Sequence, residues 1–301
     1  MINNENQVIE IMPTLLVGDS SFDAGSIPFC TLCIELDDRH IRFCIVRDEK
    51  MELIWVEDYS FDRILEASDV FEKLKKIFSA HTRWSGQSWK NVRISFNSAA
   101  FSLIPDLIFD PASVTDYLSF ALGTAIPAGE KVLYHEVPLV HAQNVFSVPQ
   151  AWHEWMINHF GTSNITFYHL TGPLIIGALV SHAEYEELRI VSVYFEKDNF
   201  FLVVSESKQL LFCNRFRFST VQELAYIILF TLNQLELLPE EIKVIGYGDV
   251  TAGSETFAEL SRFFPNLQIG KGPTTLKYSG QCADVPGHKY FGLFNTYLLS
   301  S

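Results

Sequence analysis

The order of predicted elements repeats once along this chain of 301 residues, and this repetition constrains the fold more than any other feature. Each copy consists of three strands joined by short turns, then a helix, then another strand. The first copy has strands at 29–36, 41–47, 53–57 and 92–96, with its helix at about 68–81. The second has strands at 188–195, 200–205, 210–216 and 244–246, with its helix at about 219–235. Two βββαβ units predict two similar lobes, and a cleft between them.

The two predicted helices carry start signals of different kinds. The helix at 68–81 has apolar residues at helical spacing opposite a charged face, and Ser68 is its expected N-cap. Thr220 and Glu223 have the spacing of a capping box, which places the start of the second helix. Because that helix is apolar nearly all round, we expect it to be sandwiched between other elements.

The remaining segments complete the two lobes. Residues 98–182 have helical patterns at 113–122, 150–160 and 173–181 and strand patterns at 131–138, 144–148 and 165–170. A polar stretch at 183–187 predicts the boundary between a first lobe, 1–183, and a second lobe, 184–301. In the second lobe a helix at 254–264 and a strand at 267–269 follow the repeat. A closing helix at 289–299 would allow the C-terminal segment to pack back on the first lobe.

The charge of the chain argues against two classes of partner. The formal net charge is −14 and the isoelectric point about 5.0, so nucleic acid and anionic membrane surfaces are expected to repel this protein. No stretch has the length of a membrane span, and the first residues lack the pattern of a signal peptide. Five cysteines without framework spacing indicate a reducing compartment, so we expect a cytoplasmic protein.

Two motifs that resemble metal or redox sites fail on spacing. Cys30 and Cys33 lie in a strand, where an offset of three directs the side chains to opposite faces. His153 and His159 are six residues apart, whereas a zinc-protease helix needs histidines four apart. We therefore predict buried structural cysteines and no metal site.

The βββαβ topology also permits a two-metal nuclease, which needs converging carboxylates. In the first lobe Glu35 is available, but the fourth strand ends in Asn97. In the second lobe the candidates are Glu196, Glu223 and Asp249, although Glu223 is already explained as a capping residue. The acidic net charge opposes a polyanionic substrate.

Several stretches resemble an uncharacterised bacterial family, domain-of-unknown-function family 3822. These stretches are FSLIP at 101–105, LIF at 107–109, YL at 117–118, NVFSVP at 144–149, LFCNRF at 211–216, residues 226–234 with Leu237 and Pro239, and the turn at Gly248. The resemblance covers most of the chain from 101 to 264. It implies an α/β fold with mixed sheets: the duplicated βββαβα actin-like ATPase, or ribonuclease H-like, fold, distantly similar to PilM-type pilus-assembly proteins.

The resemblance also implies where a nucleotide would bind. Active members of the actin-like superfamily hold ATP phosphates with a glycine turn between the first two strands of each lobe. The corresponding turns here, at 34–40 and 194–199, contain no glycine. Only the Gly246–Gly248 segment occupies the position of the adenosine loop. The candidate site is thus a vestigial cleft formed by Asp37, Asp38, Glu196, Asp198, Gly246, Gly248 and Asp249.

These observations predict a non-catalytic scaffold or adaptor that binds a protein or peptide partner. No catalytic residue and no cofactor are predicted. One alternative is a divergent ATP-dependent phosphotransferase or ATPase, in which Asp37 or Glu196 would position Mg²⁺. Another is a small-ligand sensor in the cleft. In the adaptor interpretation, Asp37 and Glu196 are exposed turn carboxylates whose replacement costs little stability.

Overall fold

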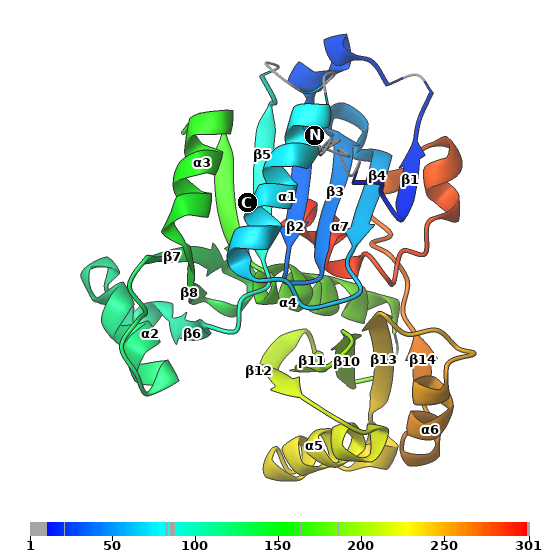
Figure 1. Cartoon of the computed structure of the whole chain (residues 1–301). Helices are drawn as coiled ribbons and strands as arrows, with labels where there is room; N and C mark the ends of the chain where they lie inside the picture. The colour runs from blue at the N-terminus through cyan, green and yellow to red at the C-terminus, as the bar shows by residue number, and fades with distance from the viewer. Residues whose placement is uncertain are drawn as a thin grey trace, which may run out of the picture.

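A computed structural model describes residues 11–299, except 21, 82, 83, 85–87, 163 and 186. The first ten residues, which were considered above for a signal peptide, lie outside this range. The described strands form three sheets, of seven, five and three strands, with helices against their faces (Figure 1). No helix in the described part of the chain combines the length and apolar character that a bilayer crossing requires.

The first sheet begins with the meander that the sequence predicts. Its order is β1-β4-β3-β2-β5-β9, and β15 pairs with β4. The strands are β1 (Leu15–Gly18), β2 (Cys30–Leu36), β3 (His40–Arg47), β4 (Glu52–Ser60), β5 (Asn91–Phe96), β9 (Ile165–His169) and β15 (Lys277–Tyr278). β2, β3 and β4 are antiparallel, whereas β5 and β9 continue from β2 in parallel. β1 and β15 are additions that the sequence patterns do not indicate.

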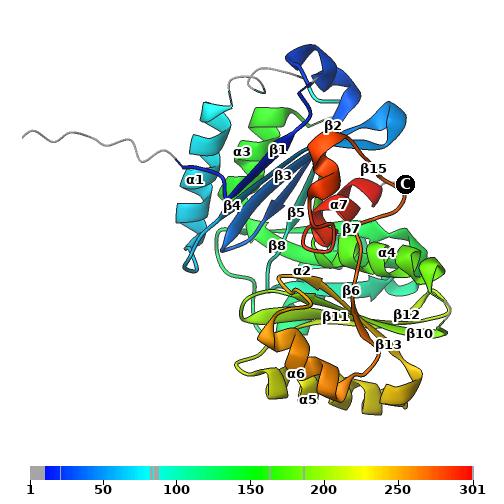
Figure 2. The same cartoon turned by 90° about the vertical axis from the view of Figure 1, so that its right-hand side faces the viewer.

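Helices cover both faces of this sheet. α1 (Ala67–Ala80) and α3 (Gln150–Phe160) pack on one face, and α7 (Phe291–Leu298) packs on the other, against β2, β3 and β5 (Figure 2). Cys30 lies in the core on the α1 side, and Cys33 lies in the core on the α7 side, as the offset of three predicts. The predicted N-cap at Ser68 is wrong, because α1 begins after Glu66 without a side-chain cap.

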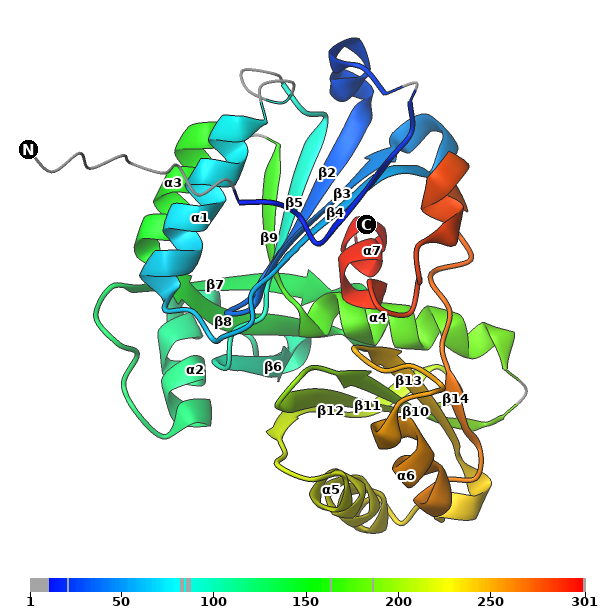
Figure 3. The ribbon, with the colours of Figure 1, turned by 45° about the vertical axis from the view of Figure 1, so that its right-hand side comes forward.

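The second sheet has the strand order of the predicted repeat. Its order, β12-β11-β10-β13-β14, matches β4-β3-β2-β5-β9 of the first sheet. The strands are β10 (Arg189–Phe195), β11 (Asn199–Glu206), β12 (Gln209–Arg217), β13 (Lys243–Gly248) and β14 (Leu267–Ile269). α5 (Val221–Gln234) and α6 (Glu255–Phe263) cover its outer face, and α4 (Thr171–Ser181) lies between the two lobes (Figure 3).

The expectation that the helix after Thr220 is sandwiched is wrong. α5 buries Leu224, Ile228 and Leu232, but the side chains of Tyr226 and Phe230 are 65% and 52% exposed. Those two rings stack on each other, with centroids 6.1 Å apart. The helix buried from Thr171 to Leu179 is instead α4, which packs against β11, β12 and α7. Since α4 contacts both lobes, the boundary at 183/184 stays a prediction.

A third, smaller sheet extends the first lobe. It has the order β6-β8-β7 and is covered by α2 (Val114–Leu122). Its strands are β6 (Phe101–Pro105), β7 (Glu130–Val137) and β8 (Ala142–Pro149). Short 3-10 turns occur at Ala24–Phe29, Asp48–Lys50, Asp106–Ile108, Pro111–Ser113, Pro138–Val140, His182–Glu184, Pro239–Glu241 and Gly280–Asp284.

Candidate functional site

Two turns from different lobes meet at the carboxyl ends of the central strands. One turn joins β2 to β3, and the other joins β10 to β11. The Arg39 guanidinium of the first turn donates a hydrogen bond to the Asp198 carboxylate of the second. These residues lie 159 positions apart in the sequence, so this ion pair connects the two lobes directly.

A second contact connects the lobes next to this ion pair. Asn97, which follows β5, donates from its side-chain amide to the Glu196 carboxylate at the end of β10. The other oxygen of Glu196 lies 3.2 Å from Nη2 of Arg215, on β12. Glu196 is therefore held by one partner from each lobe.

Only a small space remains between the two turns. The cavity there has a volume of about 20 Å³ and is lined by Asp37, Asp38, Arg39, His40, Asn97, Glu196, Lys197, Asp198 and Asn199. A space of this size holds about one water molecule. A phosphate chain is larger than this space. Four of the predicted site residues, Asp37, Asp38, Glu196 and Asp198, are indeed brought together here.

The expectation that Asp37 is an exposed carboxylate is wrong. Its side chain is 10% exposed and accepts hydrogen bonds from the backbone N–H groups of Arg39 and His40. Its second oxygen lies 3.1 Å from Nδ1 of His40. Burial acts to raise the pKa of Asp37, but the His40 ring and these hydrogen bonds outweigh it and hold the pKa below its ordinary value. Asp37 thus fixes the conformation of the turn.

Glu196 is likewise not an exposed carboxylate. Its side chain is 15% exposed. Burial raises the pKa of Glu196 to about 7, against the opposing effect of the Arg215 guanidinium, and the nearby Asp37 adds to the rise. Replacing either Asp37 or Glu196 therefore disturbs a buried group.

A buried charge network lies behind the first turn. Arg42 Nη1 donates to Glu35 Oε1 at 2.8 Å, and Arg42 Nε lies 3.4 Å from Asp58 Oδ1. The Tyr290 hydroxyl donates to the other oxygen of Asp58 at 3.0 Å, and the Arg42 guanidinium lies over the Tyr290 ring. All of these groups are buried. Because Tyr290 immediately precedes α7, the network joins β2, β3 and β4 to the C-terminal helix.

The segment Gly246–Gly248 does not form an open loop. Gly246 and Gly248 lie within β13, and Gly248 has a φ of +78°. A Cβ on Gly248 would come within 2.2 Å of the Phe195 carbonyl oxygen, so close strand packing explains this glycine. Its N–H donates to the His288 carbonyl at 2.8 Å, and the Asp249 N–H donates to that of Phe195 at 2.9 Å. These amides are thus already used.

The side chain of Asp249 lies apart from the small cavity. It is 34% exposed, and its Oδ1 is 4.0 Å from Arg42 Nη2. The predicted cleft residues therefore divide into the group around the two turns, Asp249 near Arg42, and two glycines inside a strand.

The carboxylates proposed for a nuclease do not converge. Glu35 is 1% exposed and paired with Arg42, and the Glu223 carboxylate accepts a hydrogen bond from the Ser219 N–H at 2.8 Å. Among the described residues, no group of three or more His, Cys, Asp or Glu side chains is arranged to hold a metal ion. His153 and His159 instead lie against the rings of Phe167 and Trp155.

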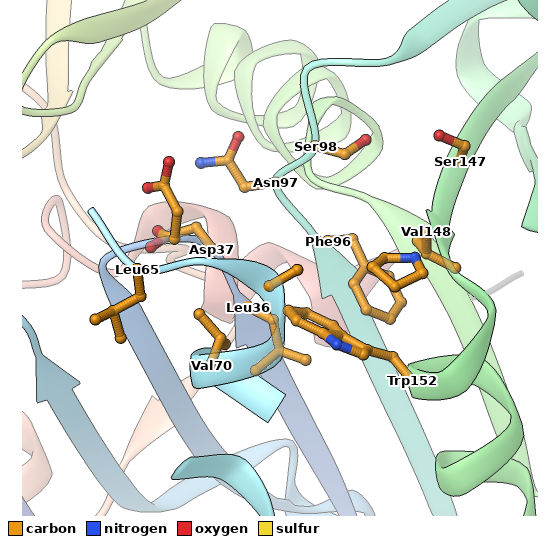
Figure 4. Close-up of a pocket in the computed structure, with 13 residues that line it drawn as sticks. Leu36, Asp37, Leu65, Val70, Phe96, Asn97, Ser98, Ser147, Val148 and Trp152 are labelled. Carbon is orange, nitrogen blue, oxygen red and sulfur yellow. The ribbon is translucent and has the colours of Figure 1, made fainter. Parts of the chain in front are cut away.

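An apolar pocket adjoins the first turn (Figure 4). Its volume is about 140 Å³, and it is lined by Leu36, Asp37, Asp38, Leu65, Ala67, Val70, Phe96, Asn97, Ser98, Ser147, Val148, Pro149 and Trp152. Figure 4 shows Leu36, Val70, Phe96 and Trp152 grouped together, with Asp37 and Asn97 along one edge. The sequence does not reveal this pocket, because its walls come from five elements whose residues have the patterns of ordinary core positions.

Three residues outside the predicted site also complete the site between the turns. Arg39 and Arg215 supply its cations, and Asn97 its interlobe amide. The sequence gives one indication that Arg39 belongs to the site, because it lies within a predicted turn directly after two acidic residues. Its partner in the other lobe could not be inferred from the sequence.

The arrangement of the two lobes defines the class of fold. A protein of unknown function from Bacteroides thetaiotaomicron VPI-5482, described as having an actin-like ATPase fold, matches with a TM-score of 0.71 and 20% identity. The match covers 83% of this chain and 93% of that protein. A structure of the PilM-PilN type IV pilus biogenesis complex matches with a TM-score of 0.61 and 11% identity, covering 90% of this chain and 98% of the matched chain. The chain has the actin-like ATPase fold.

Within that class, the family model of the proteins of unknown function named DUF3822 matches residues 19–267. The chain belongs to this family, as its sequence resemblance predicts. No curated protein sequence matches the chain significantly.

Proposed function

We propose that this protein is a non-catalytic actin-like scaffold or adaptor that binds another protein, and that its nucleotide site is degenerate. The observation that carries the proposal is the pair of interlobe contacts, Arg39 with Asp198 and Asn97 with Glu196. The first contact joins the two turns that would hold phosphates in a nucleotide-binding relative, and the second ties the end of β5 to the second of these turns. A cavity of about 20 Å³ remains there.

The chemistry of the two turns supports the same proposal. A phosphate loop offers several free backbone N–H groups to an anion. Here the N–H groups of Arg39 and His40 are used by the Asp37 carboxylate, and that of Glu196 donates to the Asn199 carbonyl. Asp38 and Asp198 add negative charge at the same place. Nucleotide phosphates would therefore meet carboxylates where they need hydrogen-bond donors.

Two further findings support a protein-binding role in the cytoplasm. The similar PilM-PilN structure is a complex of proteins, so a protein of this fold can associate with another protein. The similarity is one of fold. The five cysteines of this chain are all free thiols, which suits a reducing compartment. We place the lobe boundary at 183/184 as part of the same proposal.

Affinity purification from the native host tests the proposal. Chemical crosslinking before lysis would retain a partner of the full chain, which we expect at constant stoichiometry, with or without added Mg-ATP. The purified protein should not hydrolyse Mg-ATP.

The result that would contradict the proposal is ATP hydrolysis that disappears in both Asp37→Asn and Glu196→Gln. That outcome would favour the divergent ATPase or phosphotransferase, in which these carboxylates position Mg²⁺.

A further inference from the structure

We infer that the apolar pocket next to the β2–β3 turn anchors the partner, and that it takes one apolar side chain flanked by a basic residue in a partner peptide. This inference rests on the proposed adaptor function and specifies the site and the chemistry of the partner.

The size of the pocket selects the anchoring group. Its volume of about 140 Å³ is close to that of an apolar cavity of roughly 150 Å³ that binds benzene. The pocket therefore holds one side chain of the size of Leu, Met or Phe, and it is too small for a nucleoside.

The walls of the pocket are already in place. Leu36, Val70 and Val148 are each 1% exposed, so the packed core fixes their positions. The Trp152 ring stacks on Phe71, with centroids 6.2 Å apart at 18°, and lies 6.1 Å from the Phe96 ring. Since these walls belong to β2, α1, β8, α3 and β5, an anchoring side chain can enter without refolding, which favours affinity.

The charge at the edge of the pocket determines which residue of the peptide is favoured next to the anchoring side chain. Asp38 is exposed at this edge, and its carboxylate accepts no hydrogen bond from any residue that the structure describes. Although the residue is exposed, neighbouring atoms shield part of its carboxyl from water; this partial desolvation raises the pKa of Asp38, and the adjacent Asp37 carboxylate raises it further, against the effect of Arg215 and Arg39. An added cation would therefore be favourable beside Asp38, whereas an acidic residue there would be repelled.

The pocket also lies at the boundary between the lobes. Asp37, Asp38 and Asn97 line both this pocket and the small cavity between the turns. A peptide anchored here would thus run beside the contacts that join the lobes, where an extended partner can touch both.

Peptide display provides a direct test with the full chain. A phage library of random 12-residue peptides would be selected on the immobilised protein, and the selected peptides would be synthesised for affinity measurements. We expect enrichment of Leu, Met or Phe within two positions of Lys or Arg.

Two variant pairs locate the peptide. Ala67 is exposed and lines the pocket, so Ala67→Phe should fill its mouth, whereas Ala80→Phe alters an exposed residue at the other end of α1. Ala67→Phe should weaken peptide binding roughly 10-fold or more, the equivalent of one apolar anchor, and Ala80→Phe should leave it unchanged. Asp38→Asn should weaken binding about 2- to 5-fold, as expected of a charge at the edge, and Asp116→Asn, on α2, should have no effect.

Three outcomes would overturn the inference: no enriched peptide, enriched peptides without a basic residue, or peptides that bind Ala67→Phe as well as wild type. If the partner captured from the host also binds Ala67→Phe normally, the adaptor function stands and the partner docks elsewhere. ATP hydrolysis together with pocket-dependent peptide binding would instead remove the adaptor proposal and keep the pocket.

Discussion

Arg42 contacts two buried carboxylates with one side chain. Glu35 and Asp58 are 1% and 0% exposed, and Arg42 lies within 3.4 Å of both. Glu35 Oε2 accepts no hydrogen bond within the described part of the chain and lies against Gly292 of α7. The cation therefore compensates charges that water cannot reach.

Arg42→Met should destabilise the protein by about 3–5 kcal/mol, because it removes the buried cation next to Glu35 and leaves Asp58 with only the Tyr290 hydroxyl and the Lys289 ammonium among the described residues. Urea unfolding measures this change. Arg39→Met is the control, since its partner Asp198 is 51% exposed and the loss should be about 1 kcal/mol or less. Adding Glu35→Gln and Asp58→Asn to Arg42→Met should recover stability. If the single variant is as stable as wild type, the network is not the compensation that we describe.

Glu196 should make the free energy of unfolding depend on pH between its ordinary pKa of 4.5 and its raised pKa of about 7. Its pKa is raised from an ordinary value of 4.5 to about 7, mainly by burial. The stability it contributes is therefore fully present below pH 4.5 and is lost as the pH rises through 7. Relative to wild type, Glu196→Gln should become more stable between pH 5 and pH 8 in urea unfolding. A constant difference across this range would show that the pKa is not raised. The pKa of Asp37 is lowered, so its contribution to stability has the opposite pH dependence: it is present above the ordinary pKa of 3.8 and is lost as the pH falls below that value.

The elements show why local patterns predict some features and miss others. Short apolar runs separated by polar turns locate β2–β5 and β10–β13, and the central strands β2, β3, β10 and β11 are buried almost throughout. The same reasoning fails for α5, where Tyr226 and Phe230 are apolar but face solvent. Composition cannot distinguish an exposed apolar face from a buried one, since that depends on which elements lie opposite.

The reactivity of the cysteines on β2 and β3 tests whether these strands are central and have helices packed on both faces. Cys30, Cys33 and Cys44 are fully buried, and burial raises the pKa of Cys30 to about 11 and that of Cys44 well above its ordinary value. All three should resist a thiol reagent in the native protein and react after denaturation. Mass spectrometry of labelled peptides distinguishes the sites. Rapid native labelling of Cys30 and Cys33 together would contradict the packing of helices on both faces.

At the scale of the whole molecule, the architecture can be predicted from the sequence, but the contacts between the two turns cannot. The order of the repeated strands in both sheets follows from the βββαβ pattern, because short turns and right-handed crossovers leave few arrangements, whereas β1 and β15 do not follow from it. The contact of Arg39 with Asp198 does not follow, since it depends on how closely the lobes approach. The absence of glycine in both turns is one basis for proposing a degenerate phosphate site, but it does not predict that side chains of the two lobes join there.

Calorimetric unfolding with Mg-ATP tests the closure of this site most directly. The account predicts no rise in unfolding temperature with millimolar Mg-ATP beyond that in a control of matched ionic strength, because no space for phosphates exists between the turns. A ligand present at a hundred times its Kd would add about 2.7 kcal/mol of stability. A saturable rise in unfolding temperature, lost in Glu196→Gln, would contradict the account and show that the lobes open to bind nucleotide.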